Sequence, residues 1–216
     1  MKVKEFYNKL WKNKPEYELS DYRQGEFADF KSKWPILKKE LKLWPDGSSV
    51  LDYGCGIGRY VGEIQKFNET FRIIGLDVSN QILRVAKKRF PKQTFIPVEP
   101  DQKLLIKSNS IDVVFAGDVI EHIFDTDLFV RELYRILKKP GVVVISTPYH
   151  GVIKNLALAL LGFNIVFNVT GPHIRFFTKK SLTSLLESHG FKILKVGVYG
   201  RFYPLSKGMY CIARKT

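Results

Sequence analysis

The fold is decided by the stretch VLDYGCGIG at residues 50–58, in which an apolar, strand-like run leads into a glycine-rich turn and then a helix. Glycines at positions 54, 56 and 58 let the backbone approach a ligand closely, because a Cβ atom there would collide with it. A helix that begins near Ile57 points its unpaired N–H groups at the same ligand. Such turns serve many nucleotides, so a dinucleotide is one candidate ligand.

Two details of this turn argue against a dinucleotide. Its spacing is Gly-x-Gly-x-Gly, whereas the dinucleotide fingerprint is Gly-x-Gly-x-x-Gly. In addition, Asp52 stands two residues before the first glycine, where its carboxylate can meet an ammonium group and would repel a pyrophosphate. The turn therefore favours a ligand with a positively charged group.

Strand-like and helix-like runs alternate after the turn. Short β-rich runs separated by helical periodicity predict right-handed βαβ units and a buried parallel sheet. We expect strands near 49–53, 71–76, 93–98, 111–116 and 141–147, and helices near 57–67, 79–89 and 125–138. Two further β-rich runs, Phe191 to Tyr199 and Lys207 to Ala213, are joined by a short Gly/Pro linker and predict an antiparallel hairpin.

Helix ends are indicated by capping and breaking residues. Ser79 and Thr178 are predicted N-caps. Lys139-Pro140-Gly141 is predicted to stop the helix that begins near residue 125.

The first 48 residues mix aromatic and charged side chains. Pro15, Pro35 and Pro45 are expected to act as breakers between two or three helices that pack over the ligand cleft. The last of these helices is expected around Trp34 to Leu43.

From residue 48 onward the chain resembles the class I S-adenosylmethionine (SAM) dependent methyltransferases, with residues 50–58 in the place of their motif I. The resemblance implies SAM as the cofactor. It also implies an α/β, Rossmann-like fold, in which a seven-stranded, mostly parallel sheet ends in an antiparallel hairpin and carries helices on both faces. Asp77 closes the next predicted strand, 25 residues after Asp52. An acid at about this distance reaches ribose hydroxyls, and the family uses the position for the adenosyl ribose.

The resemblance also implies how the rest of the cofactor is held. In the family a further acid after the third strand binds the adenine amino group, and here Glu99 or Asp101 stands in that region; we prefer Glu99. The exit of the fourth strand, residues 109–116, borders the methionine part of the cofactor in the family. The predicted cofactor-binding residues are Asp52, Gly54, Cys55, Gly56, Gly58, Asp77, Val78, Glu99 and Asp118.

A second group of polar residues, Asp118-Val119-Ile120-Glu121-His122, follows the predicted fourth strand. On a helix, residues 118, 121 and 122 stand at i, i+3 and i+4, so two carboxylates and an imidazole would share one face. His173, just before the last predicted helix, would complete the group from across the cleft. Such a cluster suits either a divalent cation or a general base.

Here the chain resembles two methyltransferase branches, which act on a phenolic hydroxyl of ubiquinone precursors and on the 3′-terminal ribose of small RNAs. Both carry a Glu-x-x-Glu-His segment and a later histidine, implicated in holding a magnesium-like ion. The resemblance implies a metal set of Asp118, Glu121, His122 and His173, with Mg²⁺ or another divalent cation. Asp118 replaces the first glutamate and is one methylene shorter, which puts metal binding by this set in question. Three roles for the cluster therefore remain: a metal site, a general base or other polar contact to the substrate, and a structural helix cap.

The same cluster favours methylation of oxygen over carbon. A sulfonium-bound methyl group is already activated, so the enzyme must chiefly align acceptor, carbon and sulfur. A hydroxyl acceptor must also lose a proton, which a histidine with an ordinary pKa near 6.5 is suited to take. His122 and His173 are therefore the predicted catalytic residues.

Length and composition bound the setting of this site. The 216 residues predict a single methyltransferase domain: an N-terminal helical cap (1–48), a SAM-binding core (49–147), a substrate-lid insertion (148–177), and a final helix with β-hairpin (178–216). The two cysteines form no disulfide framework and no CxxC metal pattern, and the charged N-terminus lacks the continuous apolar core of a signal peptide. Both features predict a reducing, cytoplasmic location. No transmembrane helix is expected, because the apolar run 155–167 is too short to span a bilayer.

The acceptor is the least determined part. The net charge of +14 suits anionic partners such as nucleic acid, phosphorylated sugars or anionic lipid, although much of it is typical of dispersed surface lysine. The insertion is either an ordinary buried helix with a loop or a lid that contacts a lipid tail or a membrane surface.

We hypothesise O-methylation of a small molecule, a saccharide or lipid-linked glycan, or a prenylated phenol. The alternatives are methylation of an RNA ribose, a SAM-binding protein without turnover, and, more remotely, a dehydrogenase. The oligomeric state is not indicated by any pattern in the chain.

Overall fold

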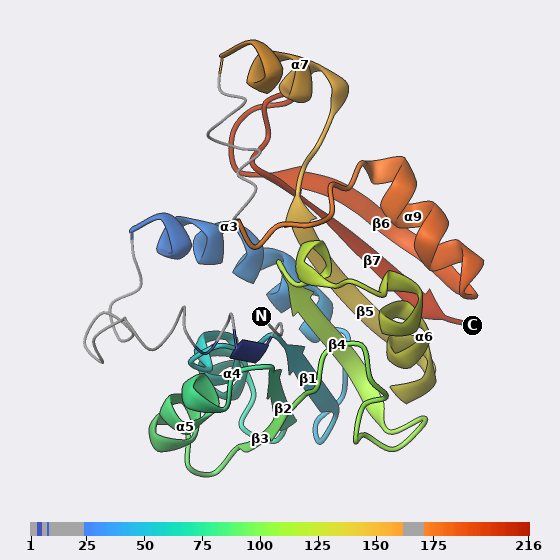
Figure 1. Ribbon diagram of the computed structural model, residues 1–216. Coiled ribbons are helices and arrows are strands. Elements are labelled where there is room, and N and C mark those ends of the chain that lie inside the picture. The colour runs from blue at the N-terminus through green and yellow to red at the C-terminus, as the bar shows by residue number, and fades with distance from the viewer. Residues whose placement is uncertain (1–3, 6–7, 9–23, 162–170) are drawn as a thin grey trace.

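The computed structural model describes residues 4, 5, 8, 24–161 and 171–216 (Figure 1). Seven strands form one sheet in the order β3-β2-β1-β4-β5-β7-β6. The strands are β1 Ser49–Tyr53, β2 Arg72–Asp77, β3 Thr94–Pro97, β4 Ile111–Gly117, β5 Leu137–Pro148, β6 Phe191–Tyr199 and β7 Gly208–Lys215. The helices are α3 Gln24–Leu41, α4 Arg59–Phe67, α5 Asn80–Arg89, α6 Thr126–Ile136, α7 Val152–Leu161 and α9 Lys179–Ser188, with a short 3₁₀ turn at Ile120–His122.

The strand pairing confirms the predicted fold class. Strands β3, β2, β1, β4 and β5 are mutually parallel, whereas β7 is antiparallel to both β5 and β6. The strand order reverses between β1 and β4, because the connection that leaves β1 leads to β2 on one side and the connection that leaves β4 leads to β5 on the other. In such sheets ligands bind beyond the carboxyl ends of the strands at this reversal.

Helices cover both faces of the sheet, as expected (Figure 1). Apolar residues of α3 and α4 are buried against one face, and those of α6 and α9 against the other. Fully buried examples are Leu37, Leu41, Val61 and Ile64 on the first face, and Leu133, Ile136, Leu182 and Leu186 on the second. Burial on both faces explains why the central strands are continuous apolar runs.

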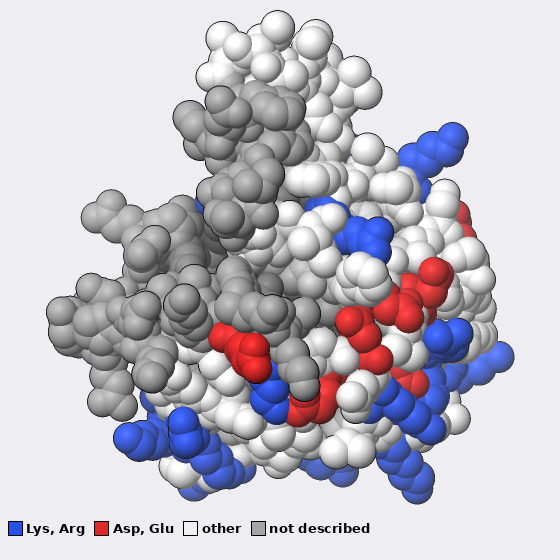
Figure 2. Space-filling view, in the orientation of Figure 1, with Lys and Arg blue, Asp and Glu red and all other residues white. Residues whose placement is uncertain are grey.

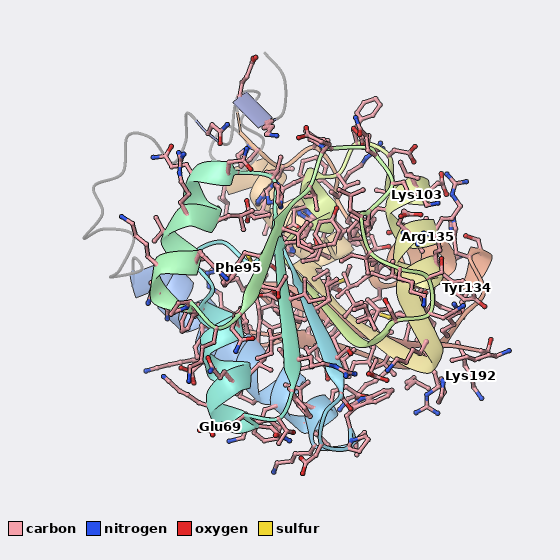
Figure 3. All side chains as sticks on the ribbon, turned by 90° about the horizontal axis from the view of Figure 1, so that it is seen from below. Glu69, Phe95, Lys103, Tyr134, Arg135 and Lys192 are labelled. Atoms are coloured by element: carbon pink, nitrogen blue, oxygen red, sulfur yellow. The ribbon has the colours of Figure 1, made fainter. Side chains whose placement is uncertain are left out.

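The loop before β4 is fixed to α6 by one buried acid and one arginine. The Glu132 carboxylate accepts from the Leu104 amide at 2.8 Å, and Arg135 donates to the carbonyls of Leu104 and Ile106. Figure 3 labels Arg135 and Lys103 on this side of the molecule. These bonds hold the chain that leads from the third strand to the fourth, and so help to shape the ligand cleft.

Predicted helix ends are confirmed in two places and wrong in one. Ser79 and Thr178 are N-caps, whose hydroxyls accept from Ile82 and Ser181 amides at 3.4 and 3.1 Å. The helix predicted to run to Lys139-Pro140 ends already at Ile136, and β5 begins at Leu137. Leu137 pairs with Ile111 before the register shifts at β4, so the proline lies in an irregular stretch of strand, where its missing N–H is tolerated.

The N-terminal prediction is also corrected. Pro35 lies inside α3, which begins at Gln24 and ends at Leu41, so it does not break the helix. Leu37 and Leu41 are completely buried, and we attribute the tolerated proline to the apolar area that this helix buries. The other helices predicted before residue 24 lie outside the described residues.

Helix α7 projects away from the sheet (Figure 1). None of its residues is buried, and Val152, Leu156, Leu160 and Leu161 are 83, 60, 74 and 87% exposed. The visible surface of this projection in Figure 2 is free of Lys, Arg, Asp and Glu. The interpretation of the insertion as an ordinary buried helix is therefore wrong for α7, while its continuation at 162–170 lies outside the described residues. Over the described part of the chain, no helix is sufficiently long and apolar to cross a membrane.

Candidate active site

A cavity of about 450 Å³ lies beyond the carboxyl ends of β1, β2 and β4. Its wall includes most of the predicted site residues, together with side chains from α3 and from the segment before α9. The predicted residues on the wall are Asp52, Gly54, Cys55, Gly56, Asp77, Val78, Asp118, His122 and His173. The cavity therefore joins the two groups of residues that the sequence places some 70 positions apart.

The glycine turn is held by backbone hydrogen bonds to β2. The amides of Gly54 and Cys55 both donate to the Leu76 carbonyl, at 2.7 and 2.8 Å. Gly54 has φ of +75°, and a Cβ atom there would lie 2.5 Å from a methyl carbon of Val119. Glycine is thus required twice at this position, by conformation and by space.

Asp52 lies at the base of the turn and is 1% exposed. Its Oδ2 atom has no hydrogen-bond partner among the described residues. Burial, and then the neighbouring Asp77 carboxylate, raise the pKa of Asp52 from 3.8 to about 8. A buried carboxyl with an unpaired oxygen on a cavity wall is suited to a cationic ligand group.

Asp77 ends β2 and is oriented by two backbone amides. Its Oδ2 accepts from the Gly56 amide at 3.0 Å and its Oδ1 from the Ser79 amide at 2.9 Å. Burial raises the pKa of Asp77, and these amide bonds oppose the rise. Each carboxylate oxygen can accept a second hydrogen bond, so the position remains suited to a pair of hydroxyls.

The two candidates for the adenine contact are placed differently. Asp101 is on the cavity wall, whereas Glu99 is not among the wall residues and its exposed side chain contacts Lys4. Asp101 has φ of +53° and accepts from the Asp125 amide at 3.0 Å. The geometry therefore supports Asp101 better than the preferred Glu99, and either assignment stays a prediction. Gly58, the third glycine, lies at the start of α4 and is also not among the wall residues.

The expected helix face at 118–122 is not formed. Asp118 has φ of +54°, which ends the strand, and only Ile120–His122 form a short 3₁₀ turn. Asp118 therefore does not share a helix face with Glu121 and His122. Its carboxylate instead contacts Lys33 of α3 and accepts from the hydroxyls of Ser146 and Tyr199, at 3.1 and 3.3 Å.

Glu121, His122 and His173 nevertheless come together. The Glu121 carbonyl accepts from the amides of Ile174 and Arg175 at 3.0 and 3.1 Å, and so fixes the later segment beside the 3₁₀ turn. The two imidazole centres are 4.9 Å apart. One ligand atom from each of the three residues lies within 4.8 Å of the others.

The electrostatics of this cluster favour a neutral imidazole. Burial lowers the pKa of His122, opposed by its contact with the Pro172 carbonyl at 2.9 Å. Since a carbonyl only accepts, Nδ1 carries the proton in this contact and Nε2 is the basic nitrogen. Burial, and then Asp118, raise the pKa of Glu121 to about 8, and its Oε2 accepts from Thr147 at 3.0 Å.

Sequence reasoning missed several wall residues. They include Phe30 and Lys33 of α3, Tyr53, Tyr60 and Phe115. The aromatic residues carry no motif, and Lys33 lies in a segment where lysines are common. Tyr53 could have been predicted, because it lies within the glycine-rich stretch at residues 50–58.

The residues present fit SAM. A positively charged amino acid moiety suits the unpaired Asp52 oxygen, an adenosyl ribose suits Asp77, and the cavity continues toward His122 and His173. The fit to a metal is less complete, because Asp118 has donors on both carboxylate oxygens.

The comparisons with known proteins agree with this geometry. A family model described as a methyltransferase domain matches residues 21–196. A malonyl-[acyl-carrier protein] O-methyltransferase of Marinomonas is 32% identical over 153 residues, which cover 68% of this chain and 56% of that protein. A ubiquinone biosynthesis O-methyltransferase of Bartonella bacilliformis is 26% identical over 156 residues, or 68% of this chain and 61% of that protein.

A crystal structure of a SAM-dependent methyltransferase from Aquifex aeolicus superimposes with a TM-score of 0.68 at 16% identity, covering 94% of this chain and 100% of that one. The chain belongs to the methyltransferase domain family, within the class I SAM-dependent superfamily. It spans between about two fifths and 69% of the length of the curated relatives compared, and 56% and 61% of the two named above.

Proposed function

We propose that this protein is a SAM-dependent methyltransferase that methylates a hydroxyl group. The observation that carries the proposal is the single cavity that joins the glycine turn and Asp52 to the imidazoles of His122 and His173. The curated relatives with O-methyltransferase names support the same chemistry. SAM supplies an activated methyl group when bound.

The residues have separate tasks in this proposal. Asp52 and Asp77 bind the cofactor through its ammonium and ribose groups, and the glycine turn admits it closely. Nε2 of His122 takes the proton of the acceptor hydroxyl, while Pro172 fixes the ring. His173 lies beside this ring and helps to orient the acceptor. Phe30, Tyr60 and Phe115 exclude water from one wall.

A divalent ion is the second version of this proposal. Glu121, His122 and His173 offer three ligand atoms within 4.8 Å of one another, a set compatible with several metals. In that version the metal would make the hydroxyl more acidic. Labelling with and without EDTA distinguishes the two versions.

The acceptor is proposed to be a small molecule, a saccharide or lipid-linked glycan, or a prenylated phenol, with peripheral contact to a membrane. The exposed apolar residues of α7 support an apolar partner. The charge distribution supports contact with an anionic membrane surface, because residues 133–216 contain thirteen Lys or Arg and only one Asp or Glu, Glu187. A cytoplasmic location stays part of the proposal, supported by two buried free cysteines, Cys55 and Cys211.

An RNA ribose is the alternative acceptor, and the same basic C-terminal part supports it. Absence of a gel shift with RNA at low salt would remove this alternative. Binding of SAM without any methyl transfer would instead support the remaining alternative, a non-catalytic SAM-binding protein.

The test is labelling of a lysate with methyl-labelled SAM, followed by separation into lipid, glycan, RNA, protein and small-molecule fractions. We expect label in the lipid, glycan or small-molecule fraction with the wild-type chain, and transfer at least about 100-fold slower with His122→Ala. Label in RNA alone would replace the proposed acceptor. Transfer that is equally fast with His122→Ala would contradict the proposed base.

A further inference from the structure

Lys33 is a charged residue in an unusual place. It lies on α3, outside every motif, and its side chain is only 8% exposed. A buried ammonium group needs a partner to offset the loss of water. Its Nζ atom contacts Oδ2 of Asp118 and lies 5.7 Å from the centre of the Tyr199 ring. Lys33 thus joins α3 to the exits of β4 and β6 at the cavity wall.

Asp118 is held from three directions. Lys33 occupies one of its oxygens, and the hydroxyls of Ser146 and Tyr199 donate to the other at 3.1 and 3.3 Å. The left-handed backbone at Asp118, with φ of +54°, aims the carboxylate at these donors. For Asp118 to ligate a metal, the lysine would have to leave.

Glu121 is the second carboxyl group in this corner and is 1% exposed. Its Oε2 accepts from Thr147, but its Oε1 has no partner among the described residues. Asp118 is partly exposed and Glu121 is buried, and two carboxylates in one corner repel each other unless a cation is placed with them. Lys33 interacts electrostatically with Glu121 as well as with Asp118.

We propose that Lys33 is a built-in cation at the acceptor end of the cavity, in the place that a divalent ion would need beside Asp118 and Glu121. Lys33 is a positioning residue: it orients Asp118, and its charge favours a deprotonated acceptor oxygen nearby. This last consequence rests on the proposed O-methylation. The charge arrangement itself does not, so the two can fail separately.

The direct test uses Mn²⁺ alone as the probe, with free Mn²⁺ measured by electron paramagnetic resonance. The purified full chain is compared with Lys33→Ala, which vacates the cation position. We expect weak binding by the wild type and binding at least about tenfold tighter by Lys33→Ala, because two carboxylates are then left without a cation. Adding Glu121→Gln to Lys33→Ala should abolish the gain.

Three controls make the result specific. Lys33→Arg keeps a cation and should bind Mn²⁺ as weakly as the wild type. Lys38→Ala removes an exposed lysine on the same helix as Lys33, whose Nζ atom lies 5.7 Å from the centre of the Phe67 ring of α4, and should not change Mn²⁺ binding. Lys33→Met keeps the apolar stem and replaces Lys33→Ala if that variant does not fold, with circular dichroism and a thermal melt as the check of folding. Equal Mn²⁺ affinity in the wild type and in the folded Lys33 variant would overturn the proposal.

A second arm concerns turnover. Wild-type methyl transfer in the labelling assay should be unchanged by EDTA, since the cation is part of the chain. Loss of transfer in EDTA with recovery in Mg²⁺ would overturn the proposal in favour of a resident metal. If no transfer is seen in any condition, the proposed function fails while the Mn²⁺ comparison still decides the role of Lys33.

Discussion

The cofactor end and the acceptor end of the cavity are built from different materials. At the cofactor end, backbone amides of the glycine turn donate to Leu76 and Asp77 of β2, and the buried Asp52 lies at the base of the turn. At the acceptor end, side chains from α3, β4, β6 and the segment before α9 meet, such as Lys33 with Asp118, 85 positions apart. Because the two ends are built separately, we expect substitutions to separate the two functions: the first end sets SAM affinity, and the second sets turnover.

The largest effect is expected at the acceptor end. His122→Ala should lower the rate of methyl transfer by about 10²–10⁴-fold, the usual contribution of a general base, without changing the dissociation constant of SAM. The measurement is the initial rate of label transfer into the responsive lysate fraction, beside a calorimetric SAM titration. His189→Ala, at the end of α9 and paired with Asp127, is the matched control and should retain the wild-type rate.

The pH dependence of the same rate follows from the lowered pKa of His122. The base must be unprotonated, so the rate should rise with pH through a pKa below 6.5 and be level above it. A rate that increases only above pH 7.5 would point to another base.

The cofactor end is tested by Asp52→Asn, which keeps the shape and removes the charge. A charged hydrogen bond contributes about 1.5–3 kcal/mol, so SAM should bind roughly 10- to 100-fold more weakly. Calorimetry measures this directly. Asp112→Asn is the control, because Asp112 pairs with Lys138 and accepts from the Ser49 amide, away from the cavity. Equal losses in both variants would mean that general destabilisation is the cause.

Asp52 also predicts a stability change in the absence of ligand. Its pKa is about 8 in the folded chain against an ordinary 3.8, so the folded state binds the proton more tightly. The free energy of unfolding should therefore fall as pH rises from about 4 to about 8. Asp52→Asn lacks this titration and should gain stability relative to the wild type at pH 8, measured by urea unfolding at pH 5 and pH 8. A stability difference that does not change with pH would contradict the buried charge.

The smallest effect is expected where a change touches neither end of the cavity. Thr178→Ala removes the N-cap of α9 and should cost about 1 kcal/mol of unfolding free energy. The melting temperature should fall by about 2–4 °C, with SAM affinity unchanged. A large loss of SAM affinity would show that the two ends are more tightly coupled than their construction implies.

The same contrast explains what the sequence predicts well. The glycine turn, the alternation of strands and helices and the N-caps at Ser79 and Thr178 depend on neighbours within a few positions, and these predictions are confirmed. The helix face at 118–122 was wrong, because the left-handed conformation of Asp118 depends on its partners, Lys33, Ser146 and Tyr199, which are distant in sequence.

Other departures have the same origin. Pro35 is tolerated inside α3 because the apolar residues of this helix are buried against the sheet. Local helix propensity does not contain this tertiary contribution. The exposure of α7 likewise depends on what the rest of the chain leaves uncovered.

SAM binding in the cavity behind the glycine turn, through Asp52, is the property on which both ends of the proposed site depend. It is tested most directly by isothermal titration of the purified chain with SAM, and with NADH in a parallel experiment. We expect a saturable heat with SAM, weaker binding of SAM by Asp52→Asn, and no heat with NADH. No heat and no thermal shift with SAM, or preferential binding of NADH, would contradict it.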